Sequence, residues 1–266
     1  MTVESDELVR VTRDGSVATI WLNRPSKRNA MNYAMWALLE ESALGLGSDP
    51  IVRVVVLRGA GAHFCAGADI TELLVSRDAD ERSFSAVVAA AELALAELPK
   101  PTVAFISGDC IGGGCSIAID CDLRVATADA RFGITPAKLG IVYPSAALER
   151  ATHLVGPAVT KRMLFTGELM DADDALRVGL VDEVVDVANG EERLATLTGV
   201  LAARSLVTQG ATKAMVAEIG AHGQVSSDTQ ARWSNVAADA PDGREGVAAF
   251  VEKRQPRFTW SGSDGD

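Results

Sequence analysis

Residues 64–70 read Phe64-Cys65-Ala66-Gly67-Ala68-Asp69-Ile70, a glycine-rich turn that follows the apolar run 51–57. A second such turn, residues 108–115, follows the apolar run 101–107 and contains three consecutive glycines. Both stretches read as turns from a strand into a helix, where the first N–H groups lack partners and the helix dipole adds partial positive charge. Two such turns facing one point would form an oxyanion hole. The alternative is that the glycines only permit tight turns and close packing.

The regions around these turns alternate between apolar strands and helical patterns. Asp14-Gly15 favours a hairpin turn, and continuous apolar runs are typical of strands covered on both faces of a sheet. The expected strands are 8–13, 16–23, 51–57, 101–107, 123–126 and 180–185. The expected helices are 29–47, 81–98, 113–120, 144–155, 158–165, 171–178, 202–219, 228–238 and 242–253. The sequence therefore predicts an α/β core over residues 1–200 and a helical region over 201–266.

The composition is that of an acidic globular protein. The chain has 266 residues, a hydrophobic fraction of 48% and a net charge of −11, which disfavours nucleic acid and anionic membranes as partners. It shows no secretory signal and no apolar run of the ~20 residues that span a bilayer, so we expect a cytoplasmic protein. The four cysteines then read as buried, reduced thiols, and their spacing fits no metal site.

Other site patterns are absent or incomplete. Neither glycine-rich turn matches the dinucleotide-binding or P-loop pattern. Residues 108–112, however, fit a nucleophile elbow in which Cys110 replaces the usual serine. Asp171 and His222 follow in the chain order of a hydrolase triad. A Cys110 hydrolase is therefore one open hypothesis.

The chain resembles the crotonase, or enoyl-CoA hydratase/isomerase, family over nearly its full length. Six motifs carry the resemblance and occur in the family's order. They are Leu22-Asn23-Arg24-Pro25 with Arg28-Asn29-Ala30-Met31, followed by residues 64–70, 112–115, 121–126, 179–184 and 250–254. The resemblance implies an α/β spiral of repeated strand–strand–helix units. It also implies a C-terminal helical region through which subunits form homotrimers, which stack into hexamers.

The resemblance further implies an acyl-CoA thioester as the ligand, with coenzyme A as part of the substrate and no permanently bound cofactor. It places the oxyanion-hole donors on the N–H groups of Ala68 and Gly113. Contacts with coenzyme A are implied for Ala30, Ala66, Asp69 and Ile70. Cations for its phosphates are implied at Arg24, Lys27 and Arg28, with Lys253 contributed by a neighbouring subunit.

The chain departs from the family at the two positions that usually hold catalytic glutamates. It has Ser116 two residues after Gly114, and Ala137 directly after Pro136. Neither side chain is an effective acid or base near neutral pH, and the loss of one such group costs ~10²–10⁴-fold in rate. We therefore expect little hydration of an enoyl-CoA by the usual mechanism.

The remaining hypotheses share the oxyanion hole. The broadest is a lyase or isomerase that acts through a thioester enolate in fatty-acid or acyl-CoA metabolism. Residues 135–143 also resemble the corresponding segment of methylmalonyl-CoA decarboxylase, which makes Tyr143 the candidate acid of a decarboxylase. The alternative for Tyr143 is a packed core residue. The other class of hypothesis is a non-catalytic acyl-CoA-binding protein.

Overall fold

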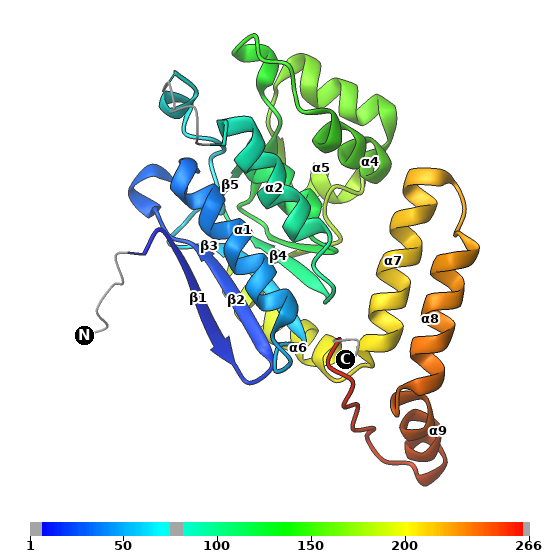
Figure 1. The fold of residues 1–266 in the computed structure, drawn as a ribbon. Helices are drawn as coiled ribbons and strands as arrows, with labels where there is room; N and C mark the ends of the chain where they lie inside the picture. The colour runs from blue at the N-terminus through cyan, green and yellow to red at the C-terminus, as the bar shows by residue number, and fades with distance from the viewer. Residues whose placement is uncertain (1–6, 75–81, 263–266) are drawn as a thin grey trace.

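The computed structural model describes residues 7–74 and 82–262 and contains a large and a small β-sheet (Figure 1). The large sheet consists of β1 Val9–Asp14, β2 Val17–Leu22, β3 Val54–Gly59, β4 Thr102–Ile106, β6 Leu123–Thr127 and β9 Glu183–Val185, in that spatial order. β1 and β2 form the expected hairpin around Gly15, whose φ of 55° suits the turn. The later neighbours pair in parallel. The strands predicted from the sequence are thus confirmed, with shifted ends.

Helices cover both faces of the large sheet. α1 Tyr33–Ser48 and α2 Phe84–Ala96 pack against each other on one face, and α6 Gly190–Ala202 lies against the other (Figure 1). Within β3, Val55 and Leu57 join the main core, whereas Val54 and Val56 pack with Leu194 of α6. Since successive strand residues point to opposite faces, a sheet covered on both sides needs a continuous apolar run.

The first helix begins later than the sequence predicts. Arg28 and Asn29 have left-handed backbone conformations, with φ of 50° and 57°, so the helix cannot include them. The side chain of Asn32 then caps α1 by accepting a hydrogen bond from the N–H of Met35 at 3.0 Å. The helix predicted over 81–98 is observed from Phe84, and residue 81 lies outside the described part of the chain.

Neither glycine-rich stretch is a simple strand-to-helix turn, which corrects the sequence prediction. The stretch 64–70 leads into a 3₁₀ helix, Ile70–Leu74, in place of an α-helix. The stretch 108–115 contains β5 Asp109–Ile111 before α3 Gly113–Asp120 begins. β5 pairs with β7 Arg131–Gly133, which pairs with β8 Met170–Asp171 to form the small sheet. Strands of two or three residues are too short to produce an alternating pattern in the sequence.

The helices predicted at 144–155 and 158–165 are two halves of one element. α4 Ser145–Thr166 contains a kink at Gly156, where φ is 76°, directly before Pro157. The next helix, α5 Ala172–Arg177, is capped by Asp171, whose side chain accepts a hydrogen bond from the N–H of Asp174 at 2.8 Å. The kink thus lies where the sequence predicts a helix end.

The C-terminal region is helical, as predicted. α7 Leu206–His222 and α8 Ser227–Asp239 form a hairpin that projects away from the large sheet, and α9 Asp242–Glu252 follows (Figure 1). An ion pair between Lys213 Nζ and Asp122 Oδ2, at 2.9 Å, connects α7 to the core. In the part of the chain that the structure describes, no helix is long and apolar enough to cross a membrane.

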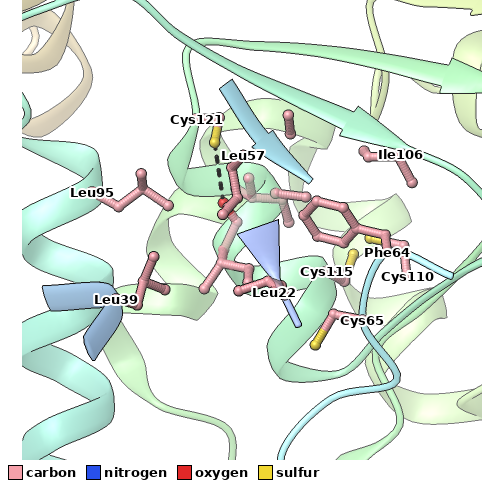
Figure 2. Packing of buried hydrophobic residues seen from close by; sticks show 14 of the residues in the cluster. Leu22, Leu39, Leu57, Phe64, Cys65, Leu95, Ile106, Cys110, Cys115 and Cys121 are labelled. Atoms are coloured by element: carbon pink, nitrogen blue, oxygen red, sulfur yellow. Dashed lines mark hydrogen bonds between the residues drawn. The ribbon is translucent and has the colours of Figure 1, made fainter. Parts of the chain in front are cut away.

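The main core also encloses the four cysteines, and none of them forms a disulfide. Cys65, Cys110 and Cys115 gather near Phe64, between the two glycine-rich stretches (Figure 2). Burial raises the pKa of Cys65 to about 12 and that of Cys110 well above its usual value. The thiols of Cys65 and Cys110 therefore stay protonated, and the buried cysteines act as small apolar side chains.

Candidate active site

The two glycine-rich stretches are held together by backbone hydrogen bonds. The N–H of Cys65 donates to the carbonyl oxygen of Asp109 at 2.9 Å, and the N–H of Ile111 donates to that of Cys65 at 2.9 Å. The contact requires glycine, because a β-carbon on Gly67 would lie 2.9 Å from the carbonyl oxygen of Ile111. A β-carbon on Gly114 would lie 2.4 Å from that of Cys65. These glycines therefore do permit close packing of the two stretches, which was one of the two interpretations of the sequence.

This contact also brings the N–H groups of Ala68 and Gly113 close together. A β-carbon on Gly113 would lie 3.5 Å from the backbone nitrogen of Ala68 and 3.1 Å from Cζ2 of the buried Trp36. Among residues 7–74 and 82–262, neither N–H donates a hydrogen bond. Gly113 is also the first residue of α3, at the positive end of its dipole. Two unpaired donors beside each other can hold a carbonyl oxygen that gains negative charge.

A buried polar cluster lies one helical turn beyond Gly113. The Oγ of Ser116 donates to Oε1 of Glu92 on α2 at 2.5 Å. The other oxygen of Glu92 contacts Nη2 of Arg150 on α4 at 3.2 Å, and Arg150 also pairs with the buried Asp120 at the end of α3. Ser116 and Glu92 are only 2% and 3% exposed. One guanidinium thus serves two carboxyls inside the protein.

Burial controls the ionisation of this cluster. It raises the pKa of Glu92, while the hydrogen bond from Ser116 and the charge of Arg150 partly offset that effect. Burial and the neighbouring Glu92 raise the pKa of Asp120 well above its usual value, again opposed by Arg150. The cluster therefore contains carboxyls that are harder to ionise than exposed ones.

The hydroxyl of Tyr143 belongs to the same region. Its oxygen is buried near Ser116 and Cys115 but has no hydrogen bond of acceptable geometry within the described residues. Burial raises the pKa of Tyr143 well above its usual value, so the phenol keeps its proton. An unpartnered buried hydroxyl is costly unless a ligand satisfies it. Ala137 differs, because it is exposed in a 3₁₀ helix, Pro136–Lys138.

The loop expected to bind phosphates lies against the first glycine-rich stretch. Arg24 makes contacts within the protein: its Nη1 pairs with Oδ2 of Asp69 at 2.7 Å and donates to the carbonyl oxygen of Ala30. Lys27 is exposed, and Arg28 is 62% exposed while pairing with Asp109 at 3.1 Å. Lys27 and Arg28 are therefore the cations of this loop that are open to a ligand.

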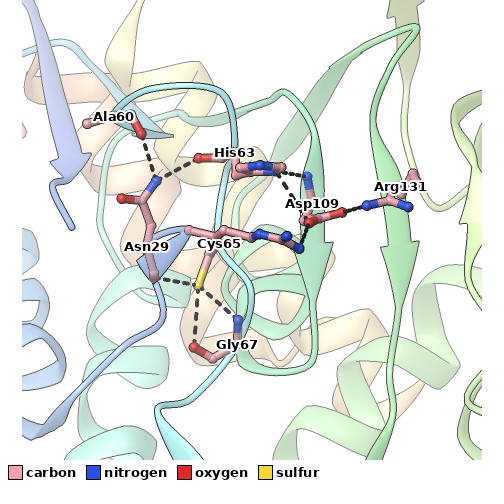
Figure 3. Close-up of polar contacts among 8 residues, drawn as sticks. Asn29, Ala60, His63, Cys65, Gly67, Asp109 and Arg131 are labelled. Carbon is pink, nitrogen blue, oxygen red and sulfur yellow. Dashed lines mark hydrogen bonds and ion pairs between the residues drawn. The ribbon is translucent and has the colours of Figure 1, made fainter. Parts of the chain in front are cut away.

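A residue that the sequence did not single out holds this loop in place. Asn29 is fully buried, and its amide donates to the carbonyl oxygens of Ala60 and His63 at 3.0 and 2.6 Å (Figure 3). Its side-chain oxygen accepts a hydrogen bond from the N–H of Arg24 at 2.9 Å. Asparagine tolerates the left-handed conformation better than most residues. Asn29 thus fixes the shape of the segment that carries Lys27 and Arg28.

The other residues expected at the ligand lie in two places. Ala66 lies beside the loop, where its N–H donates to the carbonyl oxygen of Arg28 at 2.9 Å. Ile70 is 51% exposed at the start of the 3₁₀ helix, and Asp69 is occupied by Arg24 and Thr71. Lys253 is exposed directly after α9, in the C-terminal region rather than in this loop.

Sequence reasoning missed Glu92 and Asp120, although one signal was present. Glu92 is the only charged residue in the apolar stretch 84–96, on the helix face that also buries Val87, Ala91 and Leu95. A lone carboxylate on the buried face of a helix demands a polar partner. The identity of that partner depends on how α2, α3 and α4 pack, which local sequence does not reveal.

Comparisons with known proteins show the family and the fold of the chain. Residues 12–261 match the family model described as enoyl-CoA hydratase/isomerase. The chain is 30% identical to a crotonyl-CoA hydratase of Syntrophomonas wolfei and 34% identical to a probable enoyl-CoA hydratase of Mycobacterium tuberculosis, covering 95% of this chain and 98% of each relative. It is similar to the crystal structure of an enoyl-CoA hydratase/carnithine racemase from Magnetospirillum magneticum, with 33% identity, a TM-score of 0.90 and 96% of each chain covered.

Proposed function

Because the chain belongs to the enoyl-CoA hydratase/isomerase, or crotonase, family and has its fold, we propose that it binds an acyl-CoA thioester and stabilises the enolate of that thioester. The observation that carries the proposal is the pair of adjacent, unpaired N–H groups of Ala68 and Gly113. These donors would hold the thioester oxygen as negative charge moves onto it. The expected context is fatty-acid or acyl-CoA metabolism, with coenzyme A entering as part of the substrate.

The chemistry follows from charge stabilisation at the carbonyl oxygen. When the Cα–H bond or a Cα–carboxylate bond breaks, its electron pair spreads onto that oxygen. Donors already in place stabilise this charge more strongly than mobile water does, by about 10²–10³-fold in rate per donor. Backbone N–H groups survive side-chain changes, so the replacement of two glutamates by Ser116 and Ala137 leaves this part of the site intact.

The first prediction concerns the phosphates of coenzyme A. Changing Lys27→Ala and Arg28→Ala together should weaken binding by ~1–3 kcal/mol at low salt, since both cations are open to solvent. The salt dependence of binding should also become smaller. Isothermal titration calorimetry at several salt concentrations measures both effects.

The matched control for this pair is Lys161→Ala with Arg162→Ala, which removes the same charge from an exposed position on α4. That variant should bind coenzyme A as the unchanged protein does. Equal affinity for the Lys27/Arg28 variant and the control would exclude the loop as the phosphate site.

The exposed apolar residues of α7 and α9 support the proposal that the protein is a trimer or hexamer. Val216, Ile219, Val247, Phe250 and Val251 are 49–85% exposed in the single chain. Large contiguous apolar patches mark interaction sites, and a neighbouring copy that covers these residues of α7 and α9 together would bury such a patch. The sequence resemblance implies that a neighbouring copy contributes its Lys253 to the ligand site.

A decarboxylase is the second candidate, favoured by the unpartnered hydroxyl of Tyr143. In that reaction the bond between Cα and a carboxylate breaks, carbon dioxide leaves, and the enolate takes the phenolic proton at Cα. The raised pKa of Tyr143 means that the phenol keeps its proton until the enolate, a strong base, forms beside it. Solvent would then return a proton to the phenolate.

The second prediction tests this role with methylmalonyl-CoA. If Tyr143 is the donor, Tyr143→Phe should lower kcat by about 10²-fold or more while changing KM little, because the hydroxyl acts in the transition state. Tyr33→Phe, on α1, is the control for the loss of a tyrosine hydroxyl. If Tyr143→Phe turns over every active thioester as the unchanged protein does, Tyr143 is a packing residue. A protein that binds acyl-CoA but turns over none is a non-catalytic binder.

The Cys110 hydrolase is disfavoured by the surroundings of its thiol. Cys110 lies in β5 rather than on an exposed elbow, and it is fully buried. Burial also raises its pKa, whereas a nucleophilic cysteine must be a thiolate that a substrate can reach.

A further inference from the structure

The carboxylate of Glu92 lies beside Ser116, the residue that replaces one of the family's usual glutamates. Ser116 occupies a position that usually holds a glutamate in this family, and its Oγ donates to Oε1 of Glu92 at 2.5 Å. Glu92 comes from α2, a different element from the glycine-rich turns. A hydroxyl and a carboxylate in contact can pass a proton between them, which neither Ser116 nor a distant glutamate does alone.

We propose that Glu92, acting through Ser116, is the group that takes a proton from the α-carbon of a bound acyl-CoA and returns it. The inference rests on the proposed enolate function and adds the proton-transfer group that Ser116 and Ala137 do not supply. The substrates would be thioesters that have a hydrogen on the α-carbon. Ser116 would touch the substrate, and Glu92 would position and drive the transfer from behind it.

The helix geometry directs Ser116 towards the oxyanion hole. Ser116 lies three residues after Gly113 in α3, so the two share one face of the helix. Side chains of an α-helix lean towards its N-terminus, which brings the Oγ of Ser116 back over the turn that contains Gly113. The proposal requires that a thioester held at its oxygen by Gly113 has its α-carbon on the side of Ser116.

The proton transfer balances without any co-reactant. The Cα–H bond breaks, and its proton passes to Oγ of Ser116 while the hydroxyl proton of Ser116 passes to Oε1 of Glu92. The electron pair from the broken bond moves onto the thioester oxygen, where the N–H groups of Ala68 and Gly113 stabilise it. Reversal of the same steps returns a proton to the α-carbon, so nothing is oxidised or reduced.

The surroundings of Glu92 suit a group that both accepts and releases protons. Arg150 faces it from α4, Ser116, Cys115 and Asp120 come from α3, and Tyr143 precedes α4. Burial moves the pKa of Glu92 upward and Arg150 limits that rise. A catalytic carboxyl works best when its pKa lies close to the working pH.

The experiment measures exchange of the α-hydrogens of propionyl-CoA for deuterium in D₂O by NMR. Exchange needs enolate formation but no further reaction, so it does not depend on the physiological substrate. Glu92→Gln and Ser116→Ala should each slow exchange by about 10²-fold or more while leaving coenzyme A affinity unchanged. Glu97→Gln, an exposed glutamate at the end of the same helix, should exchange at the rate of the unchanged protein.

The pH profile separates proton transfer from a merely structural role. In the unchanged protein the exchange rate should rise with pH until Glu92 is ionised. Glu92→Asp should restore part of the rate that Glu92→Gln loses and move the midpoint of this rise. If Glu92→Asp and Glu92→Gln lowered the exchange rate by the same factor at every pH and left the midpoint unmoved, Glu92 would only support the fold. Ser116→Thr, which keeps the hydroxyl, provides a second partial rescue if Glu92 variants fold poorly.

The outcomes also separate this inference from the proposed function. If removal of the Gly113 N–H abolishes exchange but Glu92→Gln and Ser116→Ala do not, the enolate function stands and the role of Glu92 is wrong. If the unchanged protein binds propionyl-CoA and exchanges no α-hydrogen, the role of Glu92 in proton transfer is wrong. The enolate function is wrong as well if the protein also decarboxylates no malonyl-type thioester.

Discussion

Gly113→Pro should slow α-hydrogen exchange of propionyl-CoA by about 10²–10³-fold, because proline deletes one of the two oxyanion donors. Gly113 is the first residue of α3, where proline is well tolerated since that N–H makes no bond within the helix. The new side chain will press on Trp36, because a β-carbon at this position lies 3.1 Å from its Cζ2.

Gly113→Ala is the matched control for this change. Alanine adds the same β-carbon against Trp36 but keeps the N–H. The ratio of the rates of the two variants therefore isolates the donor from the steric effect. Circular dichroism and thermal unfolding should first show that both variants fold. Equal exchange rates for the proline and alanine variants would mean that Gly113 donates nothing to the thioester oxygen.

Arg150→Met should destabilise the protein by ~3–5 kcal/mol near neutral pH, the usual cost of removing one partner from buried charges. Arg150 is the cation that serves both Glu92 and Asp120, and the side chain of Asp120 is fully buried. Methionine keeps most of the side-chain volume, so the loss would report charge rather than a cavity. Urea unfolding measures the difference in unfolding free energy.

The same variant should show a characteristic dependence on pH. The pKa values of Glu92 and Asp120 are raised in the folded protein, so their contribution to stability is full below the unfolded values and is lost as pH rises towards the folded ones. Without Arg150 both pKa values rise further. The deficit should then grow by up to ~1.4 kcal/mol per pH unit for each carboxyl that is protonated in the folded variant but ionised in the folded unchanged protein.

Two further variants test the cause of this loss. Asp120→Asn in the Arg150→Met background should recover part of the stability, because it removes one of the carboxyls left without a cation. Arg177→Met removes an exposed arginine paired with Asp174 on α5 and should cost at most about 1 kcal/mol with little pH dependence. A deficit for Arg150→Met that is constant from pH 5.5 to 8 would contradict the electrostatic account.

The fold was predictable from the sequence where several consecutive residues follow the same hydrophobic pattern. The continuous apolar runs gave the parallel strands, since a sheet covered on both faces buries every side chain, as Val54 and Val55 of β3 show. The start of α1 was not predictable, because Asn29 is held in a left-handed conformation by Ala60 and His63, more than 30 residues away. β5, β7 and β8 are too short to produce a pattern.

The candidate site divides in the same way. The family resemblance placed the oxyanion donors at Ala68 and Gly113, and the structure brings these two residues together, while their role stays a prediction. Arg24 pairs with Asp69, which local sequence does not show, and its contact with a ligand stays a prediction. Glu92 meets Ser116 only through the packing of α2 on α3, so the sequence indicated a buried acid without its partner.

The most direct measurement is a crystal structure of the protein with an acyl-CoA bound. A suitable ligand is a slowly reacting thioester, or a thioether analogue that keeps the carbonyl group. The account predicts that the carbonyl oxygen lies 2.7–3.1 Å, roughly the usual hydrogen-bond distance, from the backbone nitrogens of both Ala68 and Gly113, with the α-carbon on the side of Ser116. A carbonyl oxygen that points elsewhere, or that is held by neither N–H, would contradict the proposed stabilisation of an enolate.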